Sequence, residues 1–396
     1  MLLGKSASGQ LINLAEPWCR KDLERIRKTE LFSCPTCAEK VQLKLGTKRI
    51  WHFAHFDISG CVGLHEPESM YHLTAKRQLY NWLKEIHPFV EMEPYLKRLK
   101  QRPDLLLRKD SAIHAIEFQC SSIPDEILQK RTRTYRSHNI DPYWILGHTR
   151  LSNKSDCVFR MDDVAWNAIR CHGKNDPYLI YYSPRTQQFL QLQSIIPFSS
   201  RTVFASLDTQ SLSNASFPLV TDLDTHRFPQ SFIQPWKNLL QQTRMYIHLS
   251  RDPAVYSLKA RFVEKGIPAS LFPVEAGIPS KFLYWFQSPA YVWQSRFIIE
   301  LIDPVPVGQS IDFQQVYRYF LNLLDTYKLK RRFLTIKTNS HISFAIMDYL
   351  NWLALLGVLK RRSATQFLKV RDIIYPSTIA EANQKLGEIL KTISTN

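Results

Sequence analysis

The spacing of hydrophobic residues changes repeatedly between residues 68 and 150. Over residues 68–86, a helical spacing gathers three leucines, a tyrosine and a tryptophan on one face, which predicts an amphipathic helix. Residues 89–96 can form a strand. Residues 104–120 hold two apolar-rich stretches on either side of a polar segment, and this pattern predicts a β-hairpin that turns at residues 109–111.

A second helix is predicted over residues 122–139. Ser122 is placed to cap this helix, a proline is tolerated in its first turn, and two acidic residues suit the positive end of its dipole. The apolar run 141–147 predicts a buried strand. The helix before that strand has the length of a crossover connection, so we expect the strand to lie parallel to the previous one. The predicted order of elements is αβββαβ.

The pattern divides the chain into four regions. Residues 1–62 hold short strands and turns, and residues 65–155 hold the α/β unit. Residues 156–230 are interpreted as a connecting region, and residues 231–396 are predicted to be mostly helical. We therefore expect an α/β fold class with a small N-terminal region and a mostly helical C-terminal domain.

The C-terminal domain contains a helix, a second helix and a hairpin in succession. The helices are predicted over residues 313–328 and 340–356, and Gly357 ends the second of them. The hairpin carries Lys360, Arg361 and Arg362, which could meet phosphates in a winged-helix-like module. The alternative is a helical packing or protein-docking domain.

The charge of the chain says more about its partners than its length does. Among 396 residues, Lys and Arg number 52 against 35 Asp and Glu, a net charge of +17, which favours a polyanionic partner such as nucleic acid. A basic protein that merely stays soluble is the alternative. The N-terminus lacks a signal-peptide core, and no apolar run approaches the roughly 20 residues of a membrane span. Seven unevenly spaced cysteines do not resemble a secreted disulfide framework, so we expect a cytoplasmic protein.

Two acidic residues, Asp104 and Glu117, lie in the part of the hairpin that is predicted to be buried. Period-two geometry puts Glu117 and Gln119 on one face of their strand, and the hairpin brings Asp104 across from Glu117. Two carboxylates from adjacent strands suit Mg²⁺ or Mn²⁺, which could activate water and neutralise charge on a phosphodiester. Alternatively, Asp104 caps a turn after Pro103, and Glu117 pairs with a nearby arginine. Under the metal hypothesis, we expect the two carboxylates to lie close enough to share one ion.

An ordered set of motifs accompanies this pair. The segments RPDLLL and AIEFQCS, the helix with Arg131 and Tyr135, and YWILG together resemble the PD-(D/E)XK nuclease core, and specifically the competence-protein CoiA family. ESMYHLTAK, CPTC and WHFAHF match the same family in the same order, and the C-terminal half matches more loosely. The resemblance implies a restriction-endonuclease-like fold. It also implies a DNA-processing role in natural transformation, with recombination or DNA-uptake proteins as partners.

The resemblance assigns roles to the acidic pair. Asp104 and Glu117 would bind the metal ion, and Gln119 occupies the position where the wider superfamily has a lysine. That lysine normally helps to orient the attacking water and to stabilise the charged transition state, to which an uncharged Gln contributes much less.

A neighbouring helix offers a replacement for the missing lysine. Glu68, His72 and Lys76 follow one another at intervals of four and share a helical face. Lys76 could supply the positive charge, and His72 or Glu68 could act on a proton or on the metal. The alternative is an exposed face with ordinary ion pairs.

The helix after the Glu117 strand carries a second pair. Arg131 and Tyr135 lie one helical turn apart, and similar nucleases have a polar residue and a tyrosine at this spacing. Arg131 would contact a phosphate and Tyr135 would position the strand. A packed tyrosine beside a solvated arginine is the simpler alternative.

Four N-terminal residues have the spacing of a zinc site. Cys34 and Cys37 form a typical knuckle, while His52 and His55 are closer together than usual. Alternatively, the histidines lie in an aromatic patch with Trp51, and the cysteines are buried or free. These aromatics, flanked by lysine and arginine, could also stack on single-stranded DNA.

Together these features predict an intracellular, metal-dependent DNA nuclease or a DNA-processing factor built on that fold. The second hypothesis is a catalytically inactive DNA-binding adaptor that loads or recruits recombination proteins, because Gln119 replaces the lysine. A zinc-organised scaffold is the third and fits the excess positive charge less well.

Overall fold

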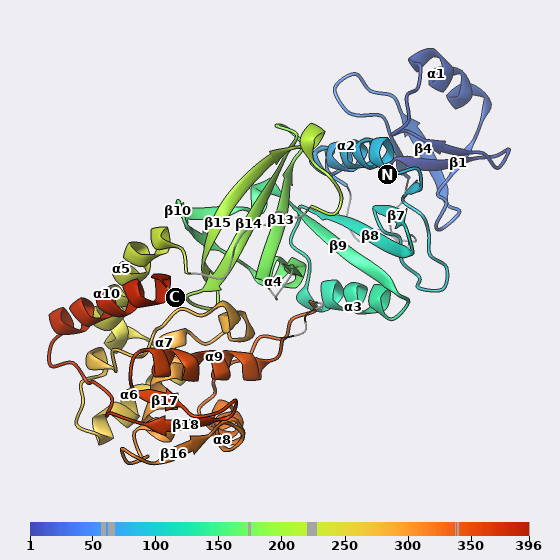
Figure 1. Ribbon diagram of the computed structural model, residues 1–396. Coiled ribbons are helices and arrows are strands. Elements are labelled where there is room, and N and C mark those ends of the chain that lie inside the picture. Colours follow the sequence, from blue (N-terminus) through green and yellow to red (C-terminus); the bar gives the residue numbers. More distant parts are fainter. Residues whose placement is uncertain are drawn as a thin grey trace.

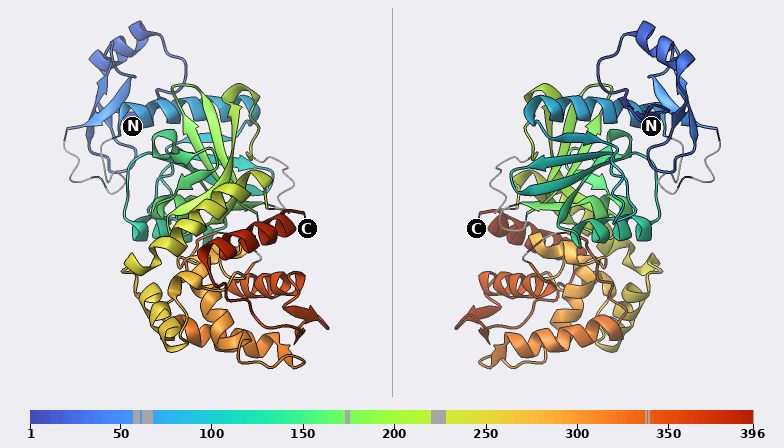
Figure 2. Two further views of the ribbon diagram at one scale, coloured as in Figure 1. Left: turned by 90° about the vertical axis from the view of Figure 1, so that its left-hand side faces the viewer. Right: turned by 90° about the vertical axis from the view of Figure 1, so that its right-hand side faces the viewer.

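The computed structural model is an elongated molecule with the N-terminal part at one end and the helical C-terminal part at the other (Figure 1). Between them stands a large, twisted, mixed sheet, visible from two sides in Figure 2. The structure describes residues 1–56, 61, 68–172, 176–219, 228–336, 338 and 340–395. The predicted boundary between residues 62 and 65 lies outside these ranges.

The N-terminal part is an antiparallel sheet with one covering helix, α1 (Arg20–Thr29). In β4, exposed and buried residues alternate, with Val41 and Leu43 in the core, because one face of this sheet packs against the helix and the central part. The strands, in spatial order, are β2 (Leu11–Asn13), β1 (Leu3–Ser6), β3 (Phe32–Ser33), β4 (Lys40–Lys44) and β5 (His52–His55).

The predicted α/β unit is present with the expected elements. In chain order these are α2 (Met70–Ile86), β6 (Val90–Met92), β7 (Leu105–Lys109), β8 (Ala112–Gln119), α3 (Asp125–Arg136) and β9 (Ile140–Gly147). β6, β7 and β8 pair in antiparallel fashion, and β8 pairs in parallel with β9. The hairpin turns at Asp110, whose positive φ of 53° suits a tight turn.

The helix caps differ in part from the prediction. Ser69 caps α2 by accepting a hydrogen bond from the His72 amide at 3.2 Å. Ser122 does not cap α3, contrary to the prediction: Pro124 precedes the first helical residue and provides no side-chain cap. The acidic residues Asp125 and Glu126 still occupy the first turn, where they interact favourably with the helix dipole.

The sheet continues well beyond residue 155, where the sequence places a domain boundary. The added elements are β10 (Ser152–Ser155), β11 (Val158–Arg160), α4 (Asp163–Ala168), β12 (Arg170–His172), β13 (Asp176–Ser183), β14 (Gln188–Pro197) and β15 (Thr202–Ser211). The strand order is β10-β11-β15-β14-β13-β9-β8-β7-β6, with β12 paired to β13. The expected connecting region is therefore part of the same sheet. β13 is buried almost along its whole length, so it lacks the alternation that marks a half-exposed strand.

The two faces of the central sheet belong to different cores. On β9, Tyr143 and Ile145 pack toward α2 and the N-terminal part, whereas Trp144 and Leu146 pack toward the C-terminal part. This division follows from the alternation of side chains along a strand. The central sheet is therefore held from both sides.

The C-terminal part is mostly helical, as predicted, with a small sheet ordered β16-β18-β17. Figure 1 shows α5 beside α10 next to the large sheet, and the small sheet at the far end. The elements are α5 (Gln230–Tyr246), α6 (Pro253–Glu264), α7 (Ala290–Phe297), β16 (Ser310–Asp312), α8 (Phe313–Thr326), α9 (Ile342–Leu355), β17 (Leu359–Arg361), β18 (Gln366–Lys369) and α10 (Ile379–Thr395). Short helical turns occur at His148–Arg150, Leu212–Asn214, Ile247–Leu249, Ala269–Leu271, Lys281–Trp285 and Ile298–Ile302.

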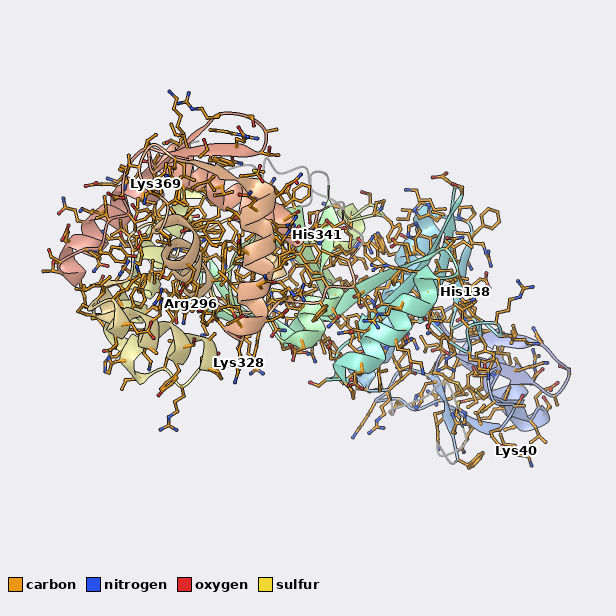
Figure 3. All side chains as sticks on the ribbon, turned by 90° about the horizontal axis from the view of Figure 1, so that it is seen from below. Lys40, His138, Arg296, Lys328, His341 and Lys369 are labelled. Atoms are coloured by element: carbon orange, nitrogen blue, oxygen red, sulfur yellow. The ribbon has the colours of Figure 1, made fainter. Side chains whose placement is uncertain are left out.

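Basic side chains are spread over the molecule. In Figure 3, Lys40 lies on the N-terminal part, while Lys328 and Lys369 lie on the C-terminal part at the other end. Across the residues described, the structure has no helix that is both long enough and apolar enough to pass through a bilayer.

Candidate functional site

Asp104 lies immediately before β7 and is fixed by the neighbouring strand. Its Oδ2 accepts a hydrogen bond from the amide of Phe118 at 2.8 Å, so the hairpin brings Asp104 to the Glu117 end of β8 as expected. Its main-chain oxygen accepts a further hydrogen bond from the amide of Glu93 at 2.9 Å. The carboxylate is therefore held at one place on the sheet edge.

The polar face of α2 points at this carboxylate. His72 Nε2 lies 3.3 Å from Asp104 Oδ2, and Lys76 Nζ lies 3.3 Å from Asp104 Oδ1. Lys76 also pairs with Glu68. The structure thus brings together the three α2-side residues identified in the sequence, and the alternative of an exposed face is wrong because Lys76 is only 1% exposed.

The sequence analysis did not identify Glu93, which is also part of this cluster. Glu93 is buried, pairs with Lys76, and accepts hydrogen bonds from the amides of Leu2 and Leu3 at 3.2 and 3.4 Å. Its φ of 47° is unusual for a residue other than glycine, and such backbone conformations concentrate at functional sites. A glutamate inside the predicted strand 89–96 was the available signal.

Three carboxylates therefore surround one ammonium group. Burial alone would lower the pKa of Lys76, but Glu68, Glu93 and Asp104 outweigh it and raise that pKa. Burial would raise the pKa of Asp104, but Lys76 and His72 lower it well below its usual range. The N-terminal ammonium group of Met1 lies 2.7 Å from Oε2 of Glu68 and adds positive charge to the cluster.

His72 is also charged in this arrangement. Burial by itself would lower the pKa of His72, but the Asp104 carboxylate outweighs burial and raises the pKa to about 10. At neutral pH the imidazole therefore holds a proton next to Asp104.

Glu117 has other partners. Its Oε1 accepts a hydrogen bond from the Tyr135 hydroxyl at 2.5 Å and pairs with Arg131, so α3 supplies both contacts. Burial raises the pKa of Glu117, the Arg131 guanidinium opposes that rise, and the negative charge of Asp104 adds to it. Pairing with an arginine is the alternative that the sequence analysis left open. Tyr135 is packed, but Arg131 is not simply solvated.

Gln119 is buried at the end of β8, where its amide donates to the main-chain oxygen and hydroxyl of Ser121 at 2.9 and 3.0 Å. These two hydrogen bonds stabilise the end of β8. Lys76, by contrast, has its charged group beside Asp104. The position of positive charge therefore matches the hypothesis in which α2 replaces the missing lysine.

Some of the potential ligand atoms at this site suit a hard divalent cation. Glu68, His72 and Asp104 each offer a ligand atom, and these atoms all lie within 4.8 Å of one another. The two carboxylates suit Mg²⁺ or Mn²⁺, whereas His72 would have to lose its proton before its imidazole could bind a metal ion. Glu117 does not belong to this group, because Arg131 and Tyr135 engage its carboxylate. Arg131 and Tyr135 both contact Oε1 of Glu117, so sharing one ion with Asp104 would use the Oε2 oxygen.

A second ligand cluster lies in the N-terminal part. Cys34, Cys37, His55 and Cys61 have their donor atoms within 4.8 Å of one another, and Cys37 Sγ lies 3.4 Å from His55 Nε2. The knuckle closes where the Ala38 amide donates to the Cys34 oxygen at 2.9 Å, with a φ of 62° at Ala38. Three sulfurs and one imidazole suit tetrahedral zinc.

His52 is not in this cluster, contrary to the predicted ligand set. His52 and His55 are three residues apart on β5, so their side chains point to opposite faces of the sheet. The His52 ring nitrogen Nδ1 instead lies 2.9 Å from the Ile50 oxygen. Cys61 takes the fourth position. The signal for it was the five residues between His55 and Cys61, which fall within common zinc-ligand spacing.

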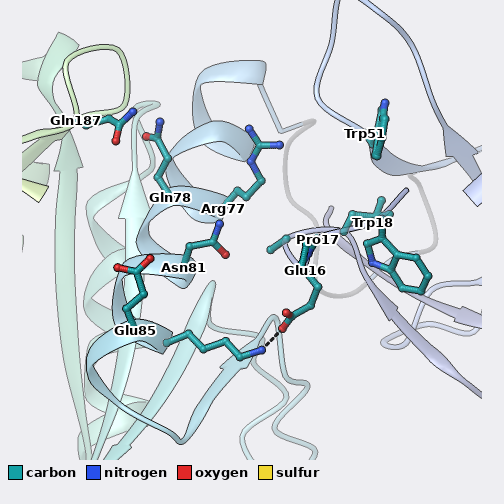
Figure 4. A pocket seen from close by; sticks show the side chains of 12 residues that line it. Glu16, Pro17, Trp18, Trp51, Arg77, Gln78, Asn81, Glu85 and Gln187 are labelled. Carbon is teal, nitrogen blue, oxygen red and sulfur yellow. Dashed lines mark hydrogen bonds and ion pairs between the residues drawn. The ribbon is translucent and has the colours of Figure 1, made fainter. Parts of the chain in front are cut away.

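A groove of about 730 Å³ separates the N-terminal part from α2 (Figure 4). Trp18 and Trp51 form one wall, and Arg77 and Asn81 on α2 form the other. An ion pair between Glu16 and Lys84 spans the groove. Trp51 is the aromatic residue that the sequence analysis assigned to a patch, and here Trp18 joins it.

Three family models match successive parts of the chain. The N-terminal domain of competence protein CoiA matches residues 15–63, its nuclease-like domain matches residues 68–223, and its C-terminal domain matches residues 228–382. A curated relative, competence protein CoiA of Bacillus subtilis (strain 168), is 33% identical over 280 residues, which cover 70% of this chain and 73% of the relative. No solved structure matches the chain.

Proposed function

Because the chain belongs to the competence protein CoiA family, we propose that it processes DNA during natural transformation through a metal-dependent nuclease-like domain. The observation that carries this proposal is the convergence of α2, β7 and β8 on Asp104. The chain order of the elements from α2 to β9 supports the αβββαβ core that the resemblance implies. The net charge of +17 supports a polyanionic substrate.

Each residue of the site has a role in this proposal. Asp104, with Glu68 or Glu117, would hold Mg²⁺ or Mn²⁺, which supplies charge neutralisation at the phosphodiester and a more acidic water when bound. Lys76 keeps a positive charge beside Asp104, where it opposes the negative charge of the substrate. His72 holds a proton within reach of the same carboxylate. Arg131 and Tyr135 orient Glu117, and Arg131 would contact a phosphate.

Cleavage of plasmid and oligonucleotide DNA with Mg²⁺ or Mn²⁺ tests the proposal. Asp104→Asn and Glu117→Gln should each reduce the rate at least about a hundredfold, because each removes a charge that the ion requires. Asp110→Asn and Glu126→Gln are matched controls, since both residues are exposed near the same elements, and they should cleave like wild type. Equal activity in all five proteins would point to a contaminating nuclease and contradict the proposal.

A catalytically inactive DNA-binding adaptor is the second candidate. Gln119 fastens a strand end, and Glu117 is engaged by Arg131, which together favour a site that has lost hydrolysis. DNA binding that is retained by every variant, without cleavage by any of them, would establish this role. In that case the partners would be recombination or DNA-uptake proteins, and the protein would act in the cytoplasm.

We also propose that Cys34, Cys37, His55 and Cys61 bind a structural zinc ion. Elemental analysis should find zinc in the wild-type protein and lose it in Cys61→Ser and in the Cys34→Ser, Cys37→Ser double variant. His52→Gln and Cys19→Ser should keep it, because His52 lies on the other face of β5 and Cys19 is exposed outside the cluster. A wild-type protein without zinc, or equal loss in His52→Gln, would contradict this ligand set.

The C-terminal part favours packing or docking over DNA recognition. The order α7, β16, α8, α9, β17, β18 supports a winged-helix-like arrangement. However, α9 contains no Lys or Arg, so the helix in the recognition position offers no phosphate contact from basic side chains. Lys360, Arg361 and Arg362 are exposed on the hairpin and remain the basic surface of this module.

A further inference from the structure

A polar cleft of about 530 Å³ lies between the central and C-terminal parts. The central part contributes the starts of α3 and α4, with Asp125 and Asp163, and the turn between β14 and β15. The C-terminal part contributes the start of α7 and the segment that holds Lys330 and Arg332. We call this space the interdomain cleft.

Arg332 is a buried charge without a counter-ion. It is 5% exposed, its guanidinium lies 3.4 Å from the centre of the Trp166 ring, and its Nη2 donates to the Ser200 oxygen at 2.9 Å. Its Nη1 is buried and has no hydrogen-bond partner, and no carboxylate in the described ranges forms an ion pair with Arg332. Burial lowers the pKa of Arg332 to about 9, and the negative charge of Asp163 opposes this shift only in part.

The remaining donors of the cleft are also free to bind a ligand. Arg201 and Lys330 line it with exposed side chains, and no ion pair to either side chain is found in the described part of the chain. Hydroxyl groups of Ser199, Ser200 and Ser288 lie along the same walls. The cleft therefore holds three cationic side chains and three carboxylates, but no ion pair of the described residues joins them.

The acidic residues of the cleft are mostly engaged. Asp252 caps α6 by accepting from the amides of Ala254 and Val255 at 2.9 and 3.2 Å. Asp125 accepts hydrogen bonds from Gln129 and Asn167. Asp163 is exposed and is the acidic residue that would oppose an anion. Hydrogen-bond donors of the cleft that lack an acceptor, above all Arg332 Nη1, are therefore available to an acceptor-rich, negatively charged group.

We propose that the interdomain cleft binds a phosphate group, with Arg332 as its buried anchor and Arg201 and Lys330 as its outer contacts. A charge-assisted bond to Arg332 Nη1 would supply the missing partner. The phosphate could belong to a free nucleotide or to a DNA strand. Asp125 begins α3, and Arg131 lies six residues further along, about 9 Å at 1.5 Å per residue. Under the proposed function, a strand at the candidate site would therefore reach the cleft.

Binding to the full-length protein tests this site. Calorimetry with inorganic phosphate and with thymidine 5′-monophosphate measures the free sources, and fluorescence anisotropy with a labelled oligodeoxythymidine measures the strand. The Arg201→Gln, Lys330→Gln double variant carries the test because both side chains are exposed, so the fold should be kept. It should weaken binding about tenfold or more. Arg332→Gln should weaken binding further, and Asp163→Asn should strengthen it.

Arg318→Gln is the matched control, because Arg318 is an exposed arginine on α8 outside the cleft. Weakening for phosphate and the mononucleotide would support a free nucleotide as the source, and weakening for the oligonucleotide alone would support the DNA strand. Equal affinities for the double variant and Arg318→Gln with every probe would overturn the proposal. Calorimetry with inorganic phosphate and thymidine 5′-monophosphate involves no DNA cleavage, so an absence of cleavage would not be mistaken for an absence of the cleft site.

Discussion

The candidate site and the interdomain cleft differ in whether a buried charge has an oppositely charged partner. At the candidate site, Lys76 is enclosed by three carboxylates, and Glu117 is enclosed by Arg131 and Tyr135. In the cleft, Arg332 is almost equally buried, but its partners among the described residues are an aromatic ring and a main-chain oxygen, with no ion pair. At the candidate site, the buried charges are compensated by other residues of the chain. In the cleft, Nη1 of Arg332 is left to donate a hydrogen bond to a ligand.

This difference separates stability from binding. When one member of a compensated buried group is removed, another charge is left without a partner, which is strongly destabilising. When an uncompensated buried charge is removed, the desolvation penalty disappears with it. Substitutions at the two places should therefore have effects of very different size on folding, even though the residues are similarly buried.

The largest effect is expected for Lys76→Met. Loss of the ammonium leaves Glu68, Glu93 and Asp104 together without their shared partner, so the free energy of unfolding should fall by about 3–5 kcal/mol. Urea denaturation followed by circular dichroism measures it. Lys84→Met is the control: Lys84 pairs with Glu16 near the surface, and its loss should cost less than about 1 kcal/mol. Similar losses for the two variants would remove the contrast.

A smaller effect is expected for Tyr135→Phe. The change removes one hydroxyl that donates to the buried Glu117 carboxylate, and hydrogen bonds to charged groups contribute about 1.5–3 kcal/mol. Arg131 remains to balance the charge, so the loss should stay below that of Lys76→Met. Tyr319→Phe, at an exposed position on α8, should have a free energy of unfolding close to that of wild type. An unchanged denaturation midpoint for Tyr135→Phe would show that Glu117 does not depend on this bond.

The smallest effect on folding is expected for Arg332→Met. The variant loses the contact with Trp166 but also loses an uncompensated charge, so the free energy of unfolding should change by less than about 1 kcal/mol. Phosphate should raise the thermal midpoint of wild type and fail to raise that of Arg332→Met, since a ligand of the folded state stabilises it. A loss as large as that of Lys76→Met would mean that Arg332 is compensated after all.

Sequence analysis recovered the parts of the site that depend on short-range geometry. The shared face of His72 and Lys76 follows from helical spacing, and the approach of Asp104 to β8 follows from one hairpin, whereas Glu68 precedes the N-cap of α2 and lies outside the helix that was predicted to include it. It missed Glu93, whose partners Leu2 and Leu3 are about ninety residues away in the chain. It also chose His52 over Cys61, because spacing along the chain does not show which face of β5 a side chain occupies.

The sequence by itself determined the order of the α/β elements, the acidic pair at the hairpin and the membership of the family, because these depend on local periodicity and on ordered motifs. Tertiary structure alone decided that β13 to β15 extend the same sheet, that Lys76 is enclosed by carboxylates from three segments, and that Arg332 forms no ion pair with any carboxylate in the described ranges. The physical reason is that the free energy of a buried charge depends on neighbours brought together by packing, and hydrophobic patterns along the chain do not encode those neighbours.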